Sequence, residues 1–353
     1  MMRLAATLTA SASMLLWASP PTRADAADAP YHLERLVALG TPDRWDYVYA
    51  DSDTHRVFVA HGDRVTVVDG SSGHLVGEIA GLAGGAHGIA LVAAVGRGYT
   101  DDGHAGIAAS FDLGTLQIQH RMQAGADADG IVFDPISGHV FVIDGEPGTV
   151  TVIDPRTDTV LAAASLGSRL EFGVAGGDGK LYVNSVEKHE IVRLDTRSNA
   201  VDAHWPMPAC ERPHGLAIDP MRHLLFAGCA NSTLSVVDTG SGSVVANVPI
   251  GLGNDAVAFD PRRNLIFSPN GQDGTLSIIR ERGPKQFEPV ATLPTARSAR
   301  TIAIDVSTGR LYLVAADIDP TPPDPSSTST GGARPRYLPG SLKLLILAPQ
   351  HQR

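Results

Sequence analysis

The chain has 353 residues, 19% of them charged, and a formal net charge of −10 at neutral pH. Such an acidic surface repels the phosphate backbone of nucleic acids and anionic lipid headgroups, and no run of Lys or Arg offsets it. Nucleic acid is therefore not expected as a partner. The length would allow two domains.

The first 26 residues have the features of a secretory signal peptide. Met1, Met2 and Arg3 form the basic start, an apolar run of small residues covers 4–18, and Ala24-Asp25-Ala26 is a candidate cleavage site. The alternative is a buried first helix. The apolar run is too short to span a bilayer, and no later segment is long enough to do so. We expect residues 1–26 to be removed and the remainder, 27–353, to be periplasmic or secreted and monomeric.

Residues 33–39 form the first predicted strand after the signal peptide. They are similar to residues 160–166 and 244–250, which close later repeats of the chain. We therefore predict that the chain enters the fold on the last strand of a repeat rather than on the first.

A short sequence pattern then occurs seven times. It has a polar residue, a run of small or apolar residues and a closing position, and its clearest copies are Asp129–Pro135, His214–Pro220 and Asp255–Pro261. The closing positions are 51, 92, 134, 176, 219, 260 and 305, so the period is 41 to 45 residues. Each phrase predicts a buried strand that ends in a tight turn. This period, with four short strands per repeat, is typical of a β-propeller. We predict one all-β domain, a seven-bladed propeller with four-stranded blades.

Aspartates mark the turns of these repeats. The third strand of most repeats ends in Asp69, Asp112, Asp154, Asp195 or Asp238, and a proline follows Asp134, Asp219 and Asp260. A carboxylate in such a place accepts hydrogen bonds from backbone amides two residues on, so we expect these aspartates to be structural.

The seventh repeat reaches the end of the chain before it is complete. Residues 300–305, 310–315 and 341–347 supply three strands, and the fourth must be 33–39 from the other end of the sequence. A blade shared by both termini closes the ring and removes open sheet edges. Residues 317–340 interrupt this blade and are rich in Pro, Ser, Thr and Gly, which predicts a flexible insertion. A lid, a docking loop and a tolerated surface insertion are all open interpretations of it.

Several phrases resemble a known family. The apolar-Asp-Pro turns, Leu181–Asn184 and Thr149–Asp154 are similar to the YVTN-repeat family of bacterial seven-bladed propellers. The following segments resemble its exported, YncE-like branch: Arg44–Tyr47, His87–Ala90, Glu171-Phe172 and Ser268–Leu276. The resemblance covers residues 31–348 and implies the propeller fold. It implies no catalytic residues, because the family is mostly uncharacterised.

The repeat also predicts which side chains share a face. Strands alternate in direction within a blade, so the start of each first strand and the turn between the second and third strands lie on one face, here called the top face. The first strands line the central channel. Their opening residues should form a ring at its mouth, and these are Asp46, His87, Asp129, Glu171, His214, Asp255 and Arg300. The second-to-third turns add polar residues nearby: His61, Asp101, Asp102, His104, Asp144, Glu146, Asn184, Asn231, Asn270 and Asp273. Small residues are expected after each member of the ring, because the channel is narrow.

The composition of the ring favours a binding site. Carboxylates and imidazoles are ligands for divalent cations, so a ligand or a metal ion is expected there, and the alternative is a solvated rim in which Arg300 pairs with one carboxylate. The sequence has no HExxH, paired CxxC, P-loop or GxSxG motif, so no catalytic residue is assigned. We predict an exported binding protein, rather than an enzyme, for a small ligand or a protein partner. The alternatives are a metal-dependent hydrolase or lactonase that uses the same ring and a structural scaffold for protein interactions.

The two cysteines, Cys210 and Cys229, flank the first two strands of the fifth repeat. Pairing of these strands about the turn at 220–223 brings both to the top face, within the separation of about 7 Å that a disulfide tolerates. Export places them in an oxidising compartment. We predict a disulfide, and the alternatives are two free thiols or a zinc or redox pair.

Overall fold

The computed structural model describes residues 30–283, 285–321 and 335–350. The predicted signal peptide, 1–26, lies outside these residues, and so does 322–334 of the predicted insertion. Within the described ranges no helix has the length and apolarity needed to cross a membrane.

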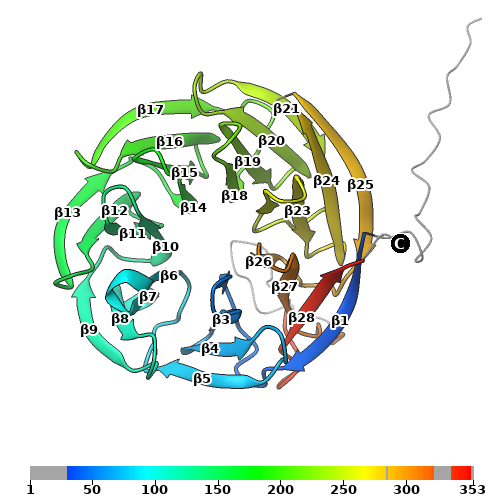
Figure 1. Ribbon diagram of the computed structural model, residues 1–353, viewed down its shortest axis with the longest axis horizontal. Helices are drawn as coiled ribbons and strands as arrows, with labels where there is room; N and C mark the ends of the chain where they lie inside the picture. The colour runs from blue at the N-terminus through cyan, green and yellow to red at the C-terminus, as the bar shows by residue number, and fades with distance from the viewer. Residues whose placement is uncertain (1–29, 284, 322–334, 351–353) are drawn as a thin grey trace, which may run out of the picture.

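The described chain forms seven four-stranded antiparallel sheets arranged in a ring, as Figure 1 shows. The predicted seven-bladed propeller is therefore confirmed. In blades one to six the strands follow chain order from the central channel outward. Blades one to three contain β2 (Val48–Ala50), β3 (Arg56–His61), β4 (Arg64–Asp69) and β5 (Leu75–Ala80); β6 (Ile89–Val92), β7 (Arg97–Asp102), β8 (Ile107–Asp112) and β9 (Ile118–Gln123); and β10 (Ala128–Asp134), β11 (His139–Asp144), β12 (Thr149–Asp154) and β13 (Thr159–Ser165).

Blades four to six repeat the same plan. They contain β14 (Leu170–Ala175), β15 (Lys180–Ser185), β16 (Glu190–Asp195) and β17 (Ala200–Pro206); β18 (Pro213–Asp219), β19 (Leu224–Cys229), β20 (Thr233–Asp238) and β21 (Val244–Pro249); and β22 (Ala258–Asp260), β23 (Leu265–Asn270), β24 (Thr275–Gly283) and β25 (Gln286–Pro294). Two short 3-10 helices, η1 (Ala93–Val95) and η2 (Gly103–Ala105), lie in the turns of blade two.

Blade seven joins the two ends of the chain. It consists of β26 (Thr301–Asp305), β27 (Arg310–Ala315) and β28 (Lys343–Pro349), with β1 (Tyr31–Ala38) as its outer strand. β1 pairs antiparallel with β28, with Leu33 opposite Leu347 and Val37 opposite Leu344. Figure 1 shows β1 in blue beside β28 in red. The predicted closure of the ring by the N-terminal strand is confirmed, and it leaves β28 with a partner on each side.

The core lies between neighbouring blades and is built on one recurring aromatic side chain. The third residue of every second strand is aromatic and at most 1% exposed: Phe58, Tyr99, Phe141, Tyr182, Phe226, Phe267 and Tyr312. The second and third strands of each blade are buried along most of their length because both sheet faces pack on another blade. The outer strands, such as β13, expose most of their residues.

The aspartates at the turns have the structural role that the repeat predicts. The carboxylate of Asp69 accepts the backbone N–H of Ser71 at 3.0 Å, and that of Asp219 accepts the N–H of Met221 at 2.9 Å. Equivalent bonds occur at Asp112, Asp134, Asp154, Asp195 and Asp260. These turns lie at the end of the blades away from the ring, which leaves the top face to less regular loops.

Cys210 and Cys229 form a disulfide with a Cα–Cα distance of 5.3 Å, as predicted. Both side chains are buried in the cluster that includes Met207 and Leu216. The bridge ties the loop before β18 to the end of β19, where Pro213 is already paired with Cys229 in the sheet.

Removal of this bridge should lower stability. In the Cys210→Ala/Cys229→Ala variant we expect the free energy of unfolding to fall by about 3 kcal/mol, because the unfolded chain gains the freedom that a loop of this length restricts. Urea denaturation measures the difference. Wild-type protein under a strong reductant should reproduce the variant, whereas equal midpoints for oxidised wild type and variant would contradict the prediction.

Candidate functional site

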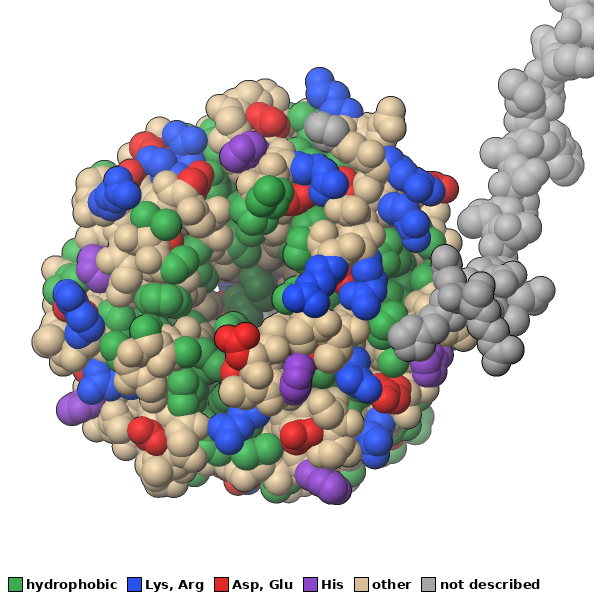
Figure 2. Space-filling view, viewed as in Figure 1, with side chains coloured by type: hydrophobic (Ala, Val, Ile, Leu, Met, Phe, Trp, Pro, Cys, Tyr) green, Lys and Arg blue, Asp and Glu red, His purple; other side chains and the backbone are tan. Residues whose placement is uncertain are grey.

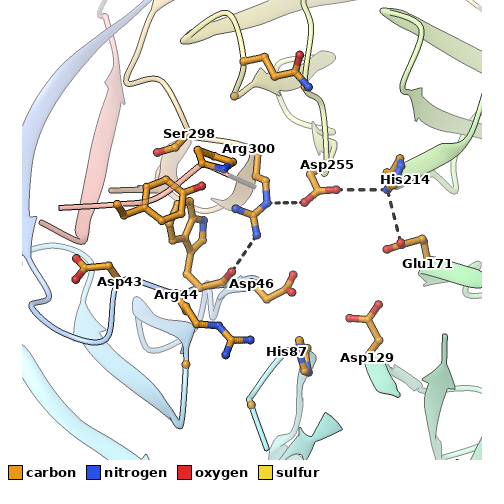
Figure 3. Close-up of a pocket in the computed structure, with 18 of the residues that line it drawn as sticks. Asp43, Arg44, Asp46, His87, Asp129, Glu171, His214, Asp255, Ser298 and Arg300 are labelled. Carbon is orange, nitrogen blue, oxygen red and sulfur yellow. Dashed lines mark hydrogen bonds and ion pairs between the residues drawn. The ribbon is translucent and has the colours of Figure 1, made fainter. Parts of the chain in front are cut away.

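All seven residues of the predicted ring line one pocket of about 1760 Å³ at the mouth of the central channel. Figure 3 shows six of them converging from different blades, together with Arg300. Turn residues between second and third strands, including Gly62, Ala230 and Gly271, also line the pocket, so it opens on the top face. The ring residues thus meet where the repeat places them. That they bind a ligand stays a prediction.

A second circle of residues surrounds the ring. Its members lie two positions before the ring residues in all seven repeats and line the same pocket: Arg44, Gly85, Asp127, Arg169, Arg212, Gly253 and Ser298. We call this circle the outer ring. Sequence reasoning missed it, although residues two apart on an extended chain point to the same side and the spacing was available as a signal.

Two aromatic side chains from opposite sides of the channel stack beneath the ring. The ring centroids of Tyr47 and Phe172 are 4.4 Å apart with an interplanar angle of 28°. These residues directly follow Asp46 and Glu171, so the expectation of small residues after every member of the ring is wrong at these two places. The channel is therefore wide enough at this level to hold two stacked aromatic rings from blades one and four.

Arg300 and Asp255 form the tightest ion pair of the ring. The Nε of Arg300 lies 2.7 Å from Oδ2 of Asp255, and its Nη2 donates to the carbonyl oxygen of Trp45 at 3.0 Å. The guanidinium also lies 4.7 Å from the centroid of the Trp45 ring, which is a cation–π contact. Tyr337, from the insertion in blade seven, packs against the indole of Trp45, with 5.1 Å between the ring centroids. The Arg300 guanidinium is therefore fixed by its contacts with Asp255 and Trp45.

His214 lies between two acidic residues without a good hydrogen bond to either. Its Nδ1 is 3.4 Å from Oδ1 of Asp255 and 3.7 Å from Oε1 of Glu171. Among the described residues this buried nitrogen has no hydrogen-bond partner. Burial lowers the pKa of His214, and the nearby guanidinium of Arg212 acts in the same direction against the charge of Asp255. At neutral pH the imidazole is uncharged and has a nitrogen available to a ligand.

The remaining carboxylates of the ring repel one another. Burial, followed by the charges of Glu171 and Asp46, raises the pKa of Asp129 well above its ordinary value. Burial and the charge of Asp255 likewise raise the pKa of Glu171 to about 8. No described residue donates a hydrogen bond to the Asp129 carboxylate, and Figure 3 shows it facing the interior of the pocket. Such clustered, perturbed carboxylates favour a functional site.

His87 is held by a fully buried carboxylate. Its Nδ1 lies 2.8 Å from Oδ1 of Asp101, and the backbone amides of His87 and Gly88 donate to the same carboxylate at 3.1 and 2.6 Å. Burial alone would lower the pKa of His87, but the hydrogen bond and charge of Asp101 outweigh it and raise this pKa to about 9. His87 therefore adds a positive charge to the ring at neutral pH.

Most polar residues of the second-to-third turns have structural partners instead of facing the pocket. His61 bonds Thr66 and the carbonyl oxygen of Pro42. The Asp144 carboxylate accepts bonds from Thr149, Thr151 and the backbone of Gly125. Asp102, Asn184, Asn231, Asn270 and Asp273 likewise bond to neighbouring groups. Of the ten turn residues named from the sequence, His104 lines the pocket.

The described residues contain no group of three or more His, Cys, Asp or Glu side chains arranged to hold a metal ion. The carboxylates of the ring come from separate blades and surround an open space, so they are suited to contact different parts of a larger molecule. The pocket exceeds the range of about 300–1,000 Å³ that is usual for small ligands.

No family model matches the chain, and no curated protein matches it. Among solved structures it is similar to a chain of Kuenenia stuttgartiensis hydrazine synthase, with a TM-score of 0.68, 14% identity and coverage of 78% of this chain and 94% of that one. It is similar to a chain of the mitotic checkpoint complex (TM-score 0.70, 16% identity, coverage 86% and 95%) and to the RRP9 WD40 repeats (TM-score 0.74, 10% identity, coverage 91% and 98%).

These similarities establish the fold alone, since identity is 16% or lower in each. The resemblance to the YVTN-repeat family gains no support from the comparisons and stays a prediction.

Proposed function

We propose that this protein is an exported binding protein that holds a ligand or a protein partner in the top-face pocket. The observation that carries the proposal is the pocket itself, which is lined by seven polar side chains from seven blades. Polar groups that converge in a site without hydrogen-bond partners cost free energy, and a bound ligand or partner would offset that cost.

Unmet hydrogen-bonding capacity supports the same proposal. The hydroxyl of Tyr47 and Nδ1 of His214 are buried and have no hydrogen-bond partner among the described residues. Tyr47 directly follows Asp46 in the chain, and the carboxylates of Asp129, Glu171, Asp46 and Asp255 all raise the pKa of its hydroxyl, after the effect of burial. Ligands commonly satisfy such groups in binding proteins.

The two alternative functions receive less support. A metal-dependent hydrolase needs a preorganised ligand set, and no such set occurs in the part of the chain that the structure describes. A passive scaffold would not need perturbed carboxylates at the channel mouth. Export is favoured by the sequence of residues 1–26, and the Cys210–Cys229 disulfide is compatible with an extracellular location.

Figure 2 shows one face of the disc, hollowed at its centre, with acidic and basic side chains interspersed around the hollow instead of gathered into one patch. This arrangement gives no continuous basic surface on that face for a nucleic acid backbone.

A thermal-shift screen tests the proposal. Mature protein is heated with a panel of amines, amino acids, carboxylic acids, sugars, short peptides and divalent cations, since a molecule that binds the folded state raises the melting temperature. At least one class should stabilise the wild type and lose its effect in Asp255→Asn. The matched control is Asp154→Asn, a turn aspartate at the opposite end of blade three. A panel with no stabiliser that depends on Asp255 would contradict the proposal.

A further inference from the structure

The ring is rich in carboxyl groups, whereas the outer ring is rich in arginines. The ring contributes four carboxyl groups, Asp46, Asp129, Glu171 and Asp255, against the guanidinium of Arg300 and the protonated imidazole of His87. Arg300 is committed to Asp255 at 2.7 Å. The Asp129 carboxylate has no ion pair or hydrogen bond with any described residue and still faces the pocket.

The outer ring is basic. It contains Arg44, Arg169 and Arg212 and one carboxylate, Asp127, and two more arginines, Arg297 and Arg336, line the same pocket. Arg169 lies 3.6 Å from Glu171, and Arg336 lies 3.0 Å from Asp319. The side chains of Arg44, Arg212 and Arg297 are exposed and form no ion pair with the residues that the structure describes.

We infer that the pocket takes a zwitterionic occupant, which places an ammonium or guanidinium group against Asp129 and Glu171 and a carboxylate or other anion against the arginines of the outer ring. This inference rests on the proposed function and names its ligand class. An occupant with only a positive charge would leave the arginines of the outer ring without a counter-charge. An occupant with only a negative charge would lie against the carboxylates of the ring. Only an occupant with both charges in this order complements both layers.

Two buried atoms supply a second, independent reason for the cationic end. Nδ1 of His214 and the hydroxyl of Tyr47 lack hydrogen-bond partners among the described residues and lie beside the ring carboxylates. An uncharged imidazole nitrogen and a phenol oxygen both accept hydrogen bonds, and an ammonium or guanidinium group provides several donors. A cationic group can donate to these atoms and to the ring carboxyl groups beside them, which an anion cannot do.

The same chemistry can come from two sources. A free amino acid carries both charges, and so does a peptide in which a Lys or Arg is flanked by acidic residues. The volume of about 1760 Å³ accommodates either source.

Isothermal titration of the mature, oxidised protein tests the inference with probes that differ by one charge. These are 6-aminohexanoic acid, hexylamine and hexanoic acid, together with L-lysine and the peptide Asp-Asp-Lys-Asp-Asp. We expect 6-aminohexanoic acid or L-lysine to bind about tenfold or more tightly than either singly charged probe, the ratio that corresponds to one favourable charge contact. Tighter binding of the peptide than of L-lysine would identify a peptide as the occupant, and the reverse order would identify a free amino acid.

Variants locate the two charges. Asp129→Asn should weaken binding of the zwitterion and of hexylamine, and Arg44→Gln should weaken binding of the zwitterion and of hexanoic acid. The control Arg156→Gln, an exposed residue in a turn at the opposite face, should change neither.

Three results would overturn the inference. Hexanoic acid or hexylamine that binds as tightly as the zwitterion through Asp129 or Arg44 refutes it while the binding function stands. Binding of the zwitterion that is equal in Asp129→Asn and wild type refutes the placement of the cation. Failure of every zwitterionic probe refutes the inference as well, and the thermal-shift screen with Asp255→Asn then decides separately whether the pocket binds any ligand.

Discussion

Glu171→Gln is expected to stabilise the folded protein at alkaline pH. Burial and the charge of Asp255 raise the pKa of Glu171 to about 8, so the folded state holds a proton that the unfolded chain has already lost. The stability that this group contributes is present in full below about pH 4.5, near the ordinary pKa of Glu, and is lost as the pH rises through about 8. Glutamine has no proton to lose.

The variant should therefore match the wild type at pH 5 and exceed it at pH 9. The expected gain is a few kcal/mol, because one pKa unit corresponds to about 1.4 kcal/mol. The charged and titratable groups near Glu171 are the carboxylates of Asp46, Asp127, Asp129 and Asp255, the guanidinium of Arg169 and the imidazole of His214. Urea denaturation at pH 5, 7 and 9 measures the difference, with the exposed Glu146→Gln as control. If the free energy of unfolding has the same pH dependence in wild type and variant, the pKa of Glu171 is not raised as described.

Phe226→Ala should cause the largest loss of stability among single substitutions considered for this fold. Phe226 is fully buried between blades five and six, with ring centroids 5.2 Å from Phe259 and 6.2 Å from Phe287. Deletion of such a ring leaves a cavity between blades, which costs about 3–5 kcal/mol in comparable cores. Met221→Ala, at a side chain that is 83% exposed in the turn before β19, is the control. Urea denaturation that places both variants within about 0.5 kcal/mol of wild type would contradict the packing described for the blades.

The fold could be predicted because its evidence is periodic. One strand phrase that recurs every 41 to 45 residues, with aspartates at fixed turns, specifies both the number of blades and the shared seventh blade. The ring residues could be predicted for the same reason, since Asp129 and His214 occupy the same backbone position in different repeats. The outer ring had an equally regular signal two residues earlier, at positions such as Arg44 and Arg212, but these residues precede the predicted strands, so the strand pattern alone does not select them.

Other features of the site depend on contacts between distant blades. Tyr47 and Phe172 are 125 positions apart and meet only because blades one and four face each other across the channel. The raised pKa of Asp129 comes from burial and from Glu171 and Asp46, which belong to other repeats. Charge states of this kind follow from three-dimensional distances, and no local pattern in the sequence records them.

Trp45 provides the most direct measurement of the central claim, that a ligand occupies the ring. The chain has three tryptophans, at 17, 45 and 205, and Trp17 lies in the predicted signal peptide. Trp205 belongs to the outer strand of blade four, where it packs on Tyr182 at 5.5 Å between centroids. In mature Trp205→Phe protein, Trp45 is thus the single tryptophan and lies under the guanidinium of Arg300 at the wall of the pocket.

Fluorescence of this Trp205→Phe protein is recorded while the zwitterionic probe that binds most tightly is titrated. We predict a saturable change in the emission of Trp45 with the same dissociation constant that calorimetry gives, and a weakened response when Asp129→Asn is added. A probe that binds by calorimetry but leaves the emission of Trp45 unchanged, or that responds equally with and without Asp129, would place the binding site elsewhere and contradict the account.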